Sequence, residues 1–387
     1  MYALEYIKKI LRAMDYFMVL LVVSLCVFGI LVIGSISGAN IDPATSLVGQ
    51  QQFTVVTGLM VLFAMSFVDY RLLSRFFWSI YGLNLLLLLA VWQFGPPTET
   101  GVQRGLAFEI AGMTLGLQAS QFAKLFMVVF LAGYIDRYHA YLNKLWFLML
   151  TAVLIAVPIM LVYQQPSLSA SMVVLLVSLA MLFLGGLSWR YIVTALTAGV
   201  PAAVLIMLDV SRGPGNHLFV DRILLQWQIG RLYDFVDTSY VQFQTEQSVR
   251  ALGSGQLTGQ GLYQGIINQM NTLPEAHNDF IFAVIGEEFG FIGAHAVLIV
   301  LLIVIVKCLL TANFADTFVG RLLAAGVGAV LLFQTFIHIG VVTNTLPNTG
   351  ITLPFVSFGG SSMWALMASM GIVMNVHINR PSRLRYE

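Results

Sequence analysis

The chain has 387 residues, of which 58% are hydrophobic and only 10% are charged, whereas soluble domains carry about 25% charged residues. This composition excludes an ordinary soluble domain and indicates a protein that crosses a membrane several times. The net charge of +1 gives no reason to expect a nucleic-acid partner. The two cysteines, Cys26 and Cys308, lie in apolar segments without a metal-ligand pattern, so neither a disulfide framework nor a metal centre is predicted there.

Apolar segments long enough to span a bilayer, which takes roughly 20 residues per helix, occur along the whole chain. The first follows Lys8, Lys9 and Arg12 and is too long for the apolar region of a signal peptide, so it is expected to be retained. Residues 1–387 are therefore predicted to form a single all-α polytopic membrane domain. Its ten expected spans are 16–37, 50–68, 76–94, 120–135, 145–163, 170–187, 191–209, 279–306, 322–344 and 358–377.

The distribution of basic residues predicts the orientation of these spans. If the N-terminus is cytoplasmic, most of the 19 lysines and arginines fall in cytoplasmic segments. An even number of spans also places the basic C-terminus in the cytoplasm. Two long segments, about 95–119 and 210–278, are then outside, and the second is a large extracytoplasmic loop between the seventh and eighth spans.

Within this large loop, the stretch FVDRILLQWQIGRLYDFV (219–236) carries apolar residues at helical spacing beside charged ones. The pattern is typical of an interfacial helix that lies on the membrane surface. A partly buried loop helix would show the same pattern, and the sequence does not separate the two. Both interpretations bring charged side chains close to the outer mouth.

Three carboxylates lie where the eighth span begins, in LPEAHNDFIFAVIGEEFGFIG (273–293). An ionisable residue inside a span costs at least a few kcal/mol and indicates a functional site. Asp279 could equally cap the helix and complement its dipole. Glu287 and Glu288 lie about 12 Å deeper and cannot both face lipid. The neighbouring glycines predict close helix packing.

Two histidines in this region of the chain raise the question of proton transfer or metal binding. His277 could carry a proton, although a turn histidine bonded to backbone is the simpler expectation. His338, in the ninth span, is expected to bond a neighbouring helix and not a metal, because no second histidine or cysteine accompanies it.

A second unusual stretch, LPNTGITLPFVSFGGSS (346–362), places prolines and glycines between two spans. Such backbone must be buried in protein or line a watery cavity, which suits a re-entrant loop. The amides of its Gly-Gly-Ser-Ser turn would suit an anionic phosphate. An ordinary helix N-cap formed by Ser361 or Ser362 explains the same residues equally well.

Together with QSVRALGSGQLTGQGL (247–262), these two stretches resemble the SEDS family of bacterial cell-wall proteins, the RodA/FtsW/SpoVE group, and most closely its RodA members. The three blocks occur in the family's order and with its spacing. The resemblance implies a peptidoglycan glycosyltransferase that polymerises lipid II on the outer face of the bacterial cytoplasmic (inner) membrane. It also implies a class B penicillin-binding protein as partner and Asp279 as the catalytic residue.

The expected reaction inverts an anomeric carbon, which requires a carboxylate base at the acceptor hydroxyl and positive charge at the leaving undecaprenyl diphosphate. Asp279 is the expected base. Arg231 and Arg250 are further cations expected at the outer level. The residues expected to bind substrate are Lys124, Arg104, Arg222, Gln121, Glu288, Ser357 and Ser361.

The first half of the chain departs from the family pattern. Arg104 is followed by Gly105 where the family has Trp, Gln121 replaces a Glu, and Ser167 stands where many members carry Asp. No cofactor is therefore assigned, and help from a divalent cation, Mg²⁺ or Mn²⁺, stays open. Glu109 could replace the missing carboxylates or be a solvated loop residue.

Two other functions fit parts of this sequence. Intramembrane acids and a broken-helix loop are features of transporters, so a flippase for lipid-linked precursors is one alternative, although no inverted repeat is visible. The altered fourth span would also suit a non-catalytic scaffold that activates a class B penicillin-binding protein. The sequence does not separate roles in elongation, division and sporulation.

Overall fold

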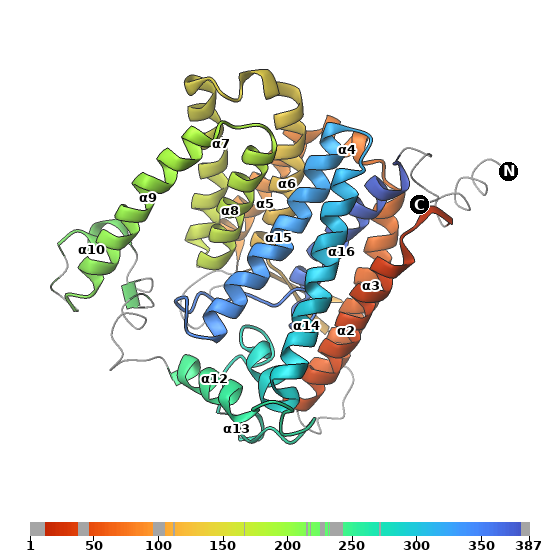
Figure 1. The fold of residues 1–387 in the computed structure, drawn as a ribbon, viewed down its shortest axis with the longest axis vertical. Helices are drawn as coiled ribbons and strands as arrows, with labels where there is room; N and C mark the ends of the chain where they lie inside the picture. The colour runs from red at the N-terminus through yellow and green to blue at the C-terminus, as the bar shows by residue number, and fades with distance from the viewer. Residues whose placement is uncertain are drawn as a thin grey trace.

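The computed structural model describes residues 12–37, 46–95, 105–110, 113–165, 167–213, 216, 218–224, 229–230, 232, 243–270 and 272–380. Most of them are helical, and Figure 1 shows the long helices packed as one bundle except for α9, which leans away from it. The long helices are α2 Tyr16–Ser37, α3 Leu47–Phe67, α5 Phe77–Phe94, α6 Ala119–Tyr138, α7 Leu145–Gln164, α8 Leu168–Leu184, α9 Trp189–Val210, α14 Ile281–Asn313, α15 Phe318–Val342 and α16 Gly360–Ile378. The short elements are α4 Tyr70–Arg75, the 3₁₀ helix η1 His139–Tyr141, α10 Val220–Ile223, α12 Phe243–Ser254, α13 Ile266–Gln269, β1 Leu106–Ile110 and β2 Met113–Leu117.

The expected all-α membrane architecture is confirmed, and a helix occupies each of the ten predicted segments. Among the described residues, eight helices are long and apolar enough to cross a membrane, whereas α8, with 17 residues, is shorter and α9 is outside that set. The count of ten spans and their orientation stay predictions. The boundaries differ most for the eighth segment, which begins at Ile281 and continues to Asn313, so that Asp279 precedes the helix.

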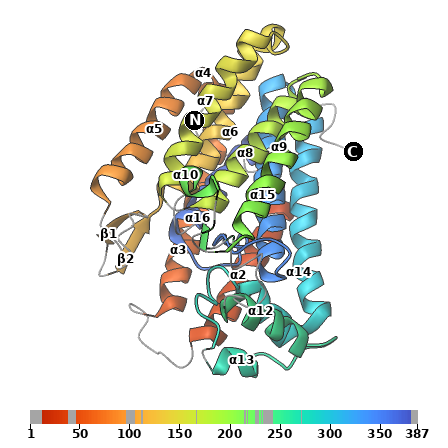
Figure 2. The ribbon, with the colours of Figure 1, turned by 90° about the vertical axis from the view of Figure 1, so that its left-hand side faces the viewer.

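The first outer loop contains a β-hairpin that the sequence did not predict. Strands β1 and β2 pair antiparallel, with Leu106 opposite Leu117 and Ile110 opposite Met113 (Figure 2). The hairpin leads directly into α6, which begins at Ala119. The hairpin thus lies between α5 and α6 in the chain, next to the start of α6.

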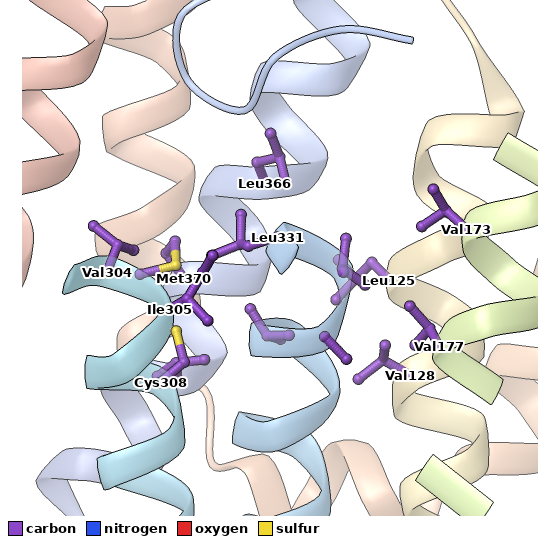
Figure 3. Packing of buried hydrophobic residues seen from close by; sticks show 14 of the residues in the cluster. Leu125, Val128, Val173, Val177, Val304, Ile305, Cys308, Leu331, Leu366 and Met370 are labelled. Atoms are coloured by element: carbon purple, nitrogen blue, oxygen red, sulfur yellow. The ribbon is translucent and has the colours of Figure 1, made fainter. Parts of the chain in front are cut away.

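Three helices form the centre of the bundle. In the apolar 18-residue stretches of α6, α15 and α16, 83%, 78% and 89% of the residues are buried inside the protein. In the corresponding stretches of α3, α5 and α7 the buried share is 28% each. A helix that is apolar all round and buried on every side belongs in the middle, and a helix with exposed apolar residues faces lipid. Figure 3 shows side chains of α6, α8, α14, α15 and α16 meeting in this core, among them Leu125, Val177, Ile305, Leu331 and Leu366.

In the large loop, the interfacial helix predicted over 219–236 is described only in part. Helix α10 covers four residues, and 225–228, 231 and 233–242 lie outside the described residues. Val220 and Ile229 are buried with Val210, at the end of α9. The choice between an interfacial and a partly buried helix stays a prediction.

Helix α14 is broken at Gly290, whose φ of 65° and ψ of −166° are not helical. The loop after α12 supplies the missing hydrogen bonds, since the amides of Gln260 and Gly261 donate to the carbonyls of Glu287 and Glu288, both at 2.9 Å. In the opposite direction, two amides just after the break donate to loop carbonyls of 256 and 257. The loop residues 256–261 thus satisfy backbone groups that lipid could not.

We expect Gly290→Ala to destabilise the protein by more than about 2 kcal/mol, because the φ and ψ of Gly290 are essentially restricted to glycine. A Cβ at this position would also lie 2.3 Å from the nitrogen of Gly259. Thermal unfolding in detergent measures the effect. The control is Gly82→Ala in α5, where an added Cβ meets nothing within 4 Å. Equal unfolding midpoints for the two variants would contradict a structural need for the break.

Candidate active site

A polar pocket of about 370 Å³ lies where four helices begin. Its wall is formed by Gln118 and Gln121 at the start of α6, Ser167 before α8, Glu275, Asn278 and Asp279 before α14, and Thr349, Gly350, Thr352 and residues 358–362 before and at the start of α16. The end of the hairpin contributes Gly105 and Gly116. In none of the four helices does the N-cap side chain bond the first turn. Four positive helix-dipole ends therefore converge on one polar cavity.

Asp279 is half-buried and lines this pocket. Helix α14 has Phe280 as its N-cap residue, so Asp279 lies one residue before the capping position. Its carboxylate approaches the re-entrant loop: a Cβ built on Gly350, which has a φ of 67°, would lie 2.9 Å from Asp279 Oδ2. The close approach requires glycine at position 350, and it directs the carboxylate across the pocket toward the loop that precedes α16.

Two sequence blocks that are far apart in the chain are joined behind Asp279. Ser357 Oγ donates to the carbonyl of Asn278 at 2.7 Å and accepts from the amide of Leu353 at 2.8 Å. The amide of Phe358 donates to the carbonyl of His277 at 2.9 Å. Ser357 is buried and is not part of the pocket wall. Its position differs from the expected substrate contact, and its hydroxyl serves to fix the re-entrant loop beside Asp279.

The serines at the start of α16 do not act as its N-cap. The N-cap residue is Gly359, and Ser361 Oγ instead donates to the carbonyl of Gly116 at 2.6 Å and accepts from the amide of Gln118 at 2.8 Å. Ser361 lines the pocket, as expected for a substrate contact, and also ties the hairpin to α16. The N-cap interpretation of these serines is therefore wrong. The first turn of α16 faces the pocket without a hydrogen bond from an N-cap side chain.

All three departures from the family pattern, Gly105, Gln121 and Ser167, line the pocket. The Gln121 side chain is 8% exposed and donates to Gln118 Oε1 at 3.3 Å, while its own Oε1 has no hydrogen-bond partner among the described residues. Thr349 Oγ1 is in the same situation within the described chain. Leaving buried polar atoms unpaired is costly, so these oxygens are suited to bind a ligand or water.

Lys124 lies behind the pocket and not in its wall. The side chain is 4% exposed, and its Nζ donates to Gln334 Oε1 at 2.7 Å. Gln334 Nε2 donates in turn to the carbonyl of Thr352 at 2.9 Å, and Thr352 lines the pocket. The ammonium group expected at the substrate therefore reaches the pocket only through Gln334.

Glu287 and Glu288 do not line the pocket, and neither faces lipid, because both are at most 1% exposed. Glu287 Oε1 accepts from the amide of Ile267 at 2.7 Å, and Glu288 Oε1 accepts from the hydroxyl of Ser35. The two acids hold α13 and α2 against the break in α14. This position differs from the substrate contact expected of Glu288.

The structure does not bring the expected arginines into the pocket wall. Arg222 is exposed on α10, and Arg250 is exposed on α12 with its guanidinium 2.5 Å from Glu246. Arg104 and Arg231 lie outside the described residues, and so does the side chain of Glu109, although its backbone pairs with Thr114 in the hairpin. In the described part of the chain, no three His, Cys, Asp or Glu side chains gather as a metal site.

The two histidines have different surroundings. His338 is fully buried, its Nδ1 bonds the carbonyl of Ile351 in the re-entrant loop at 2.6 Å, and its ring lies edge-on to Phe282 of α14. The His277 ring lies edge-on to Phe358, with Nε2 at 3.9 Å from Glu275 Oε2. Burial lowers the pKa of His277, and the nearby carboxylate of Glu275 only partly opposes this.

Comparison with known proteins identifies the family of this chain. A family model described as a cell cycle protein, FtsW/RodA/SpoVE, matches residues 16–382. The chain belongs to the FtsW/RodA/SpoVE family. As its apolar helices and bacterial relatives also indicate, it is a multi-pass bacterial membrane protein.

Two relatives are similar to this FtsW/RodA/SpoVE chain over nearly its full length. Peptidoglycan glycosyltransferase MrdB of Escherichia coli strain K12 is 34% identical over 368 residues, which cover 95% of this chain and 94% of MrdB. Probable peptidoglycan glycosyltransferase FtsW of Bacillus subtilis strain 168 is 30% identical over 385 residues, which cover 96% of this chain and 92% of that FtsW.

Solved structures share the same fold. A chain of a peptidoglycan synthase complex that coordinates polymerization and crosslinking is similar with a TM-score of 0.74 and 27% identity, covering 97% of this chain and 99% of that chain. The rod shape determining protein RodA of Thermus thermophilus gives a TM-score of 0.65 at 24% identity, covering 97% and 98%.

Several residues of this pocket were not predicted from the sequence. Asn278, Thr349 and Thr352 line it, and Gln334 connects it to Lys124. Gln334 carried one usable signal, because an amide inside a span that is otherwise apolar needs a polar partner. Nothing in the sequence identified that partner.

We expect Ser357→Ala to lower the free energy of unfolding by about 1–3 kcal/mol, because it leaves the carbonyl of Asn278 and the amide of Leu353 without their partner. Unfolding midpoints in detergent measure the loss. Ser178→Ala is the matched control, since Ser178 is equally buried but donates only to Val174 of its own helix at 2.7 Å. If both variants lose the same amount, Ser357 does not join the two blocks.

We also expect the protein to lose stability when the pH falls below about 6.5, the usual histidine pKa in an unfolded chain. The lowered pKa of His277 means that the unfolded state takes up the proton first, so the stability contributed by the neutral ring is complete above that pH and is lost on acidification. Unfolding midpoints between pH 7.5 and 5 should fall less in His277→Gln than in the parent. His295→Gln, at an exposed position of α14, should follow the parent. Parallel curves for His277→Gln and the parent would contradict this role.

Proposed function

We propose that this protein is a peptidoglycan glycosyltransferase that polymerises lipid II on the outer face of the bacterial cytoplasmic membrane, with Asp279 as general base. One observation carries the proposal: the Asp279 carboxylate shares a polar pocket with the N-terminal ends of four helices whose N-cap side chains do not bond the first turn. A base and an anion-binding wall in one cavity suit glycosyl transfer from a lipid diphosphate. The names of the relatives from Escherichia coli and Bacillus subtilis support the same activity.

In the proposed reaction, Asp279 takes the proton from the 4-hydroxyl of the acceptor sugar. The oxygen attacks the anomeric carbon of the donor while the bond from that carbon to the diphosphate oxygen breaks, and the diphosphate leaves with the electron pair. The configuration inverts because attack and departure occur on opposite sides. A positioned general base contributes about 10²–10⁴-fold to such a step.

The leaving diphosphate needs positive potential and hydrogen-bond donors. The first turn of α16 offers backbone N–H groups that have no partners within the helix, and the converging dipoles favour an anion there. Gln121 and Thr349 offer further polar contacts in the same wall. Lys124 adds its charge from behind, and Arg104 and Arg222 remain proposed ligands for phosphate at the outer mouth.

A divalent cation is an additional proposal. Mg²⁺ is usually held by one or two carboxylates together with substrate phosphates and waters. The pocket offers the carboxylates of Asp279 and Glu275 and the amide oxygen of Gln121, and the diphosphate would provide further oxygens. A bound Mg²⁺ or Mn²⁺ would neutralise part of the charge on the leaving group.

The membrane and the partner follow from the same proposal. Lipid tails of both substrates require a protein within the bilayer, and we propose the bacterial inner membrane with both termini cytoplasmic. We further propose a class B penicillin-binding protein as the crosslinking partner, supported by the similar chain in a complex that couples polymerization to crosslinking. A flippase finds less support, because Glu287 and Glu288 are buried and bonded to α13 and α2.

We expect Asp279→Asn to lower polymerisation of labelled lipid II by purified protein about 10²–10⁴-fold, because the amide cannot accept the proton. Glu246→Gln is the control, since this carboxylate lies on α12 outside the pocket wall. Unfolding midpoints verify that both variants are folded. Undiminished polymer from Asp279→Asn would remove Asp279 as base. A parent protein that scrambles lipid without polymerising it would instead favour the flippase.

A further inference from the structure

A chain of four hydrogen-bonded side chains connects the buried Lys124 to the pocket. Lys124 Nζ lies 2.7 Å from Gln334 Oε1, and Gln334 Nε2 lies 3.2 Å from Thr352 Oγ1. Thr352 Oγ1 lies 3.0 Å from Ser362 Oγ in the first turn of α16. Thr352 and Ser362 both line the pocket that contains Asp279. The chain therefore begins at a cation in the core and ends at a hydroxyl in the site.

The direction of the first two bonds follows from the chemistry of their ends. A lysine ammonium has three donors and no acceptor, so Gln334 must turn its oxygen toward Lys124. The amide nitrogen of Gln334 also faces the carbonyl of Thr352 at 2.9 Å, and a carbonyl only accepts. Both contacts thus give the Gln334 amide the same orientation, and its N–H group donates to Thr352 Oγ1.

The geometry of the last bond, between Thr352 Oγ1 and Ser362 Oγ, allows either hydroxyl to donate. Thr352 Oγ1 already accepts from Gln334, and Ser362 Oγ is the acceptor that the described part of the chain offers to its one proton. We therefore take Thr352 as the donor, so that Ser362 keeps its own proton for a different partner. Serines inside helices commonly donate back to their own helix; Ser369 of α16 does so to Ala365 at 2.7 Å. The described residues show no such bond from Ser362, which faces the pocket.

Resting on the proposed function, we propose that Ser362 donates a hydrogen bond to the diphosphate of the lipid-linked substrate, and that Lys124, Gln334 and Thr352 are positioning residues that orient its hydroxyl. The donor lies in the same turn as the backbone N–H groups of α16, which favour an anion. Each bond in such a series polarises the next, so the ammonium charge strengthens the terminal donor. The buried ammonium in turn gains an anion within reach when substrate binds.

Three single variants and one double variant test this series. Ser362→Ala removes the terminal donor, and Thr352→Val interrupts the series without changing the side-chain shape. Each should lower kcat/KM for lipid II roughly 10- to 100-fold, as expected for a hydrogen bond to a charged group. Thr352→Ser keeps the hydroxyl and should restore most activity. Once the Ser362 hydroxyl is absent, Thr352→Val should add little, so the double variant should match Ser362→Ala.

Binding of inorganic diphosphate can be measured without turnover, as the rise that it causes in the thermal unfolding midpoint of the purified protein. The stabilising shift should be smaller in Ser362→Ala and Thr352→Val and unchanged in Ser369→Ala, whose hydroxyl remains within its own helix. The inference would be overturned, even if the parent polymerises lipid II, by either of two results. One is that diphosphate raises the unfolding midpoint of Ser362→Ala and Thr352→Val as much as that of the parent. The other is that the losses of kcat/KM in the two single variants multiply in the double variant. A parent protein that binds diphosphate through Ser362 without polymerising would support the inference and overturn the proposed function.

Discussion

The backbone that leaves helical geometry inside this bundle must still find a partner for each N–H and C=O group, because lipid offers none. The re-entrant loop before α16 meets this need through Ser357 and Phe358, which bond the carbonyls of Asn278 and His277. The break at Gly290 meets it through the loop that follows α12. These bonds hold non-helical segments at the same end of the bundle as α12 and α13 (Figure 1). The pocket exists because those segments are fixed and polar.

Convergence of helix N-termini gives the pocket its electrostatic character. The helices α6, α8, α14 and α16 begin there with no N-cap side chain bonded to the first turn. Their dipoles favour a bound anion without a cation in the described wall. The lysine that the resemblance assigns to substrate binding is buried and is connected to Thr352 through Gln334. Gln121 and Ser167 add no negative charge to the wall, whose acids among the described residues are Glu275 and Asp279.

The acids that looked most anomalous in the sequence have structural partners. Glu287 and Glu288 are adjacent in the chain, but one bonds the amide of Ile267 and the other the hydroxyl of Ser35. Each therefore stabilises a different element against α14. Their burial explains why they are tolerated in an apolar segment, since a buried carboxylate with hydrogen-bond donors costs far less than one facing lipid. The acids near the start of α14 are therefore divided: Glu275 and Asp279 line the pocket, whereas Glu287 and Glu288 are buried in the scaffold.

The sequence by itself determined the apolar helices, the interrupted backbone before α16 and the position of Asp279 near a helix start, because hydropathy, glycines and prolines act on neighbouring residues. It also identified Lys124, Gln121 and Ser361 as polar residues with a purpose. Only the tertiary structure decided which of these reach the pocket. Lys124 and Gln334 are 210 residues apart, and Ser357 and Asn278 are 79 apart. A hydrogen bond between such distant residues depends on how helices pack, and no local pattern encodes that packing.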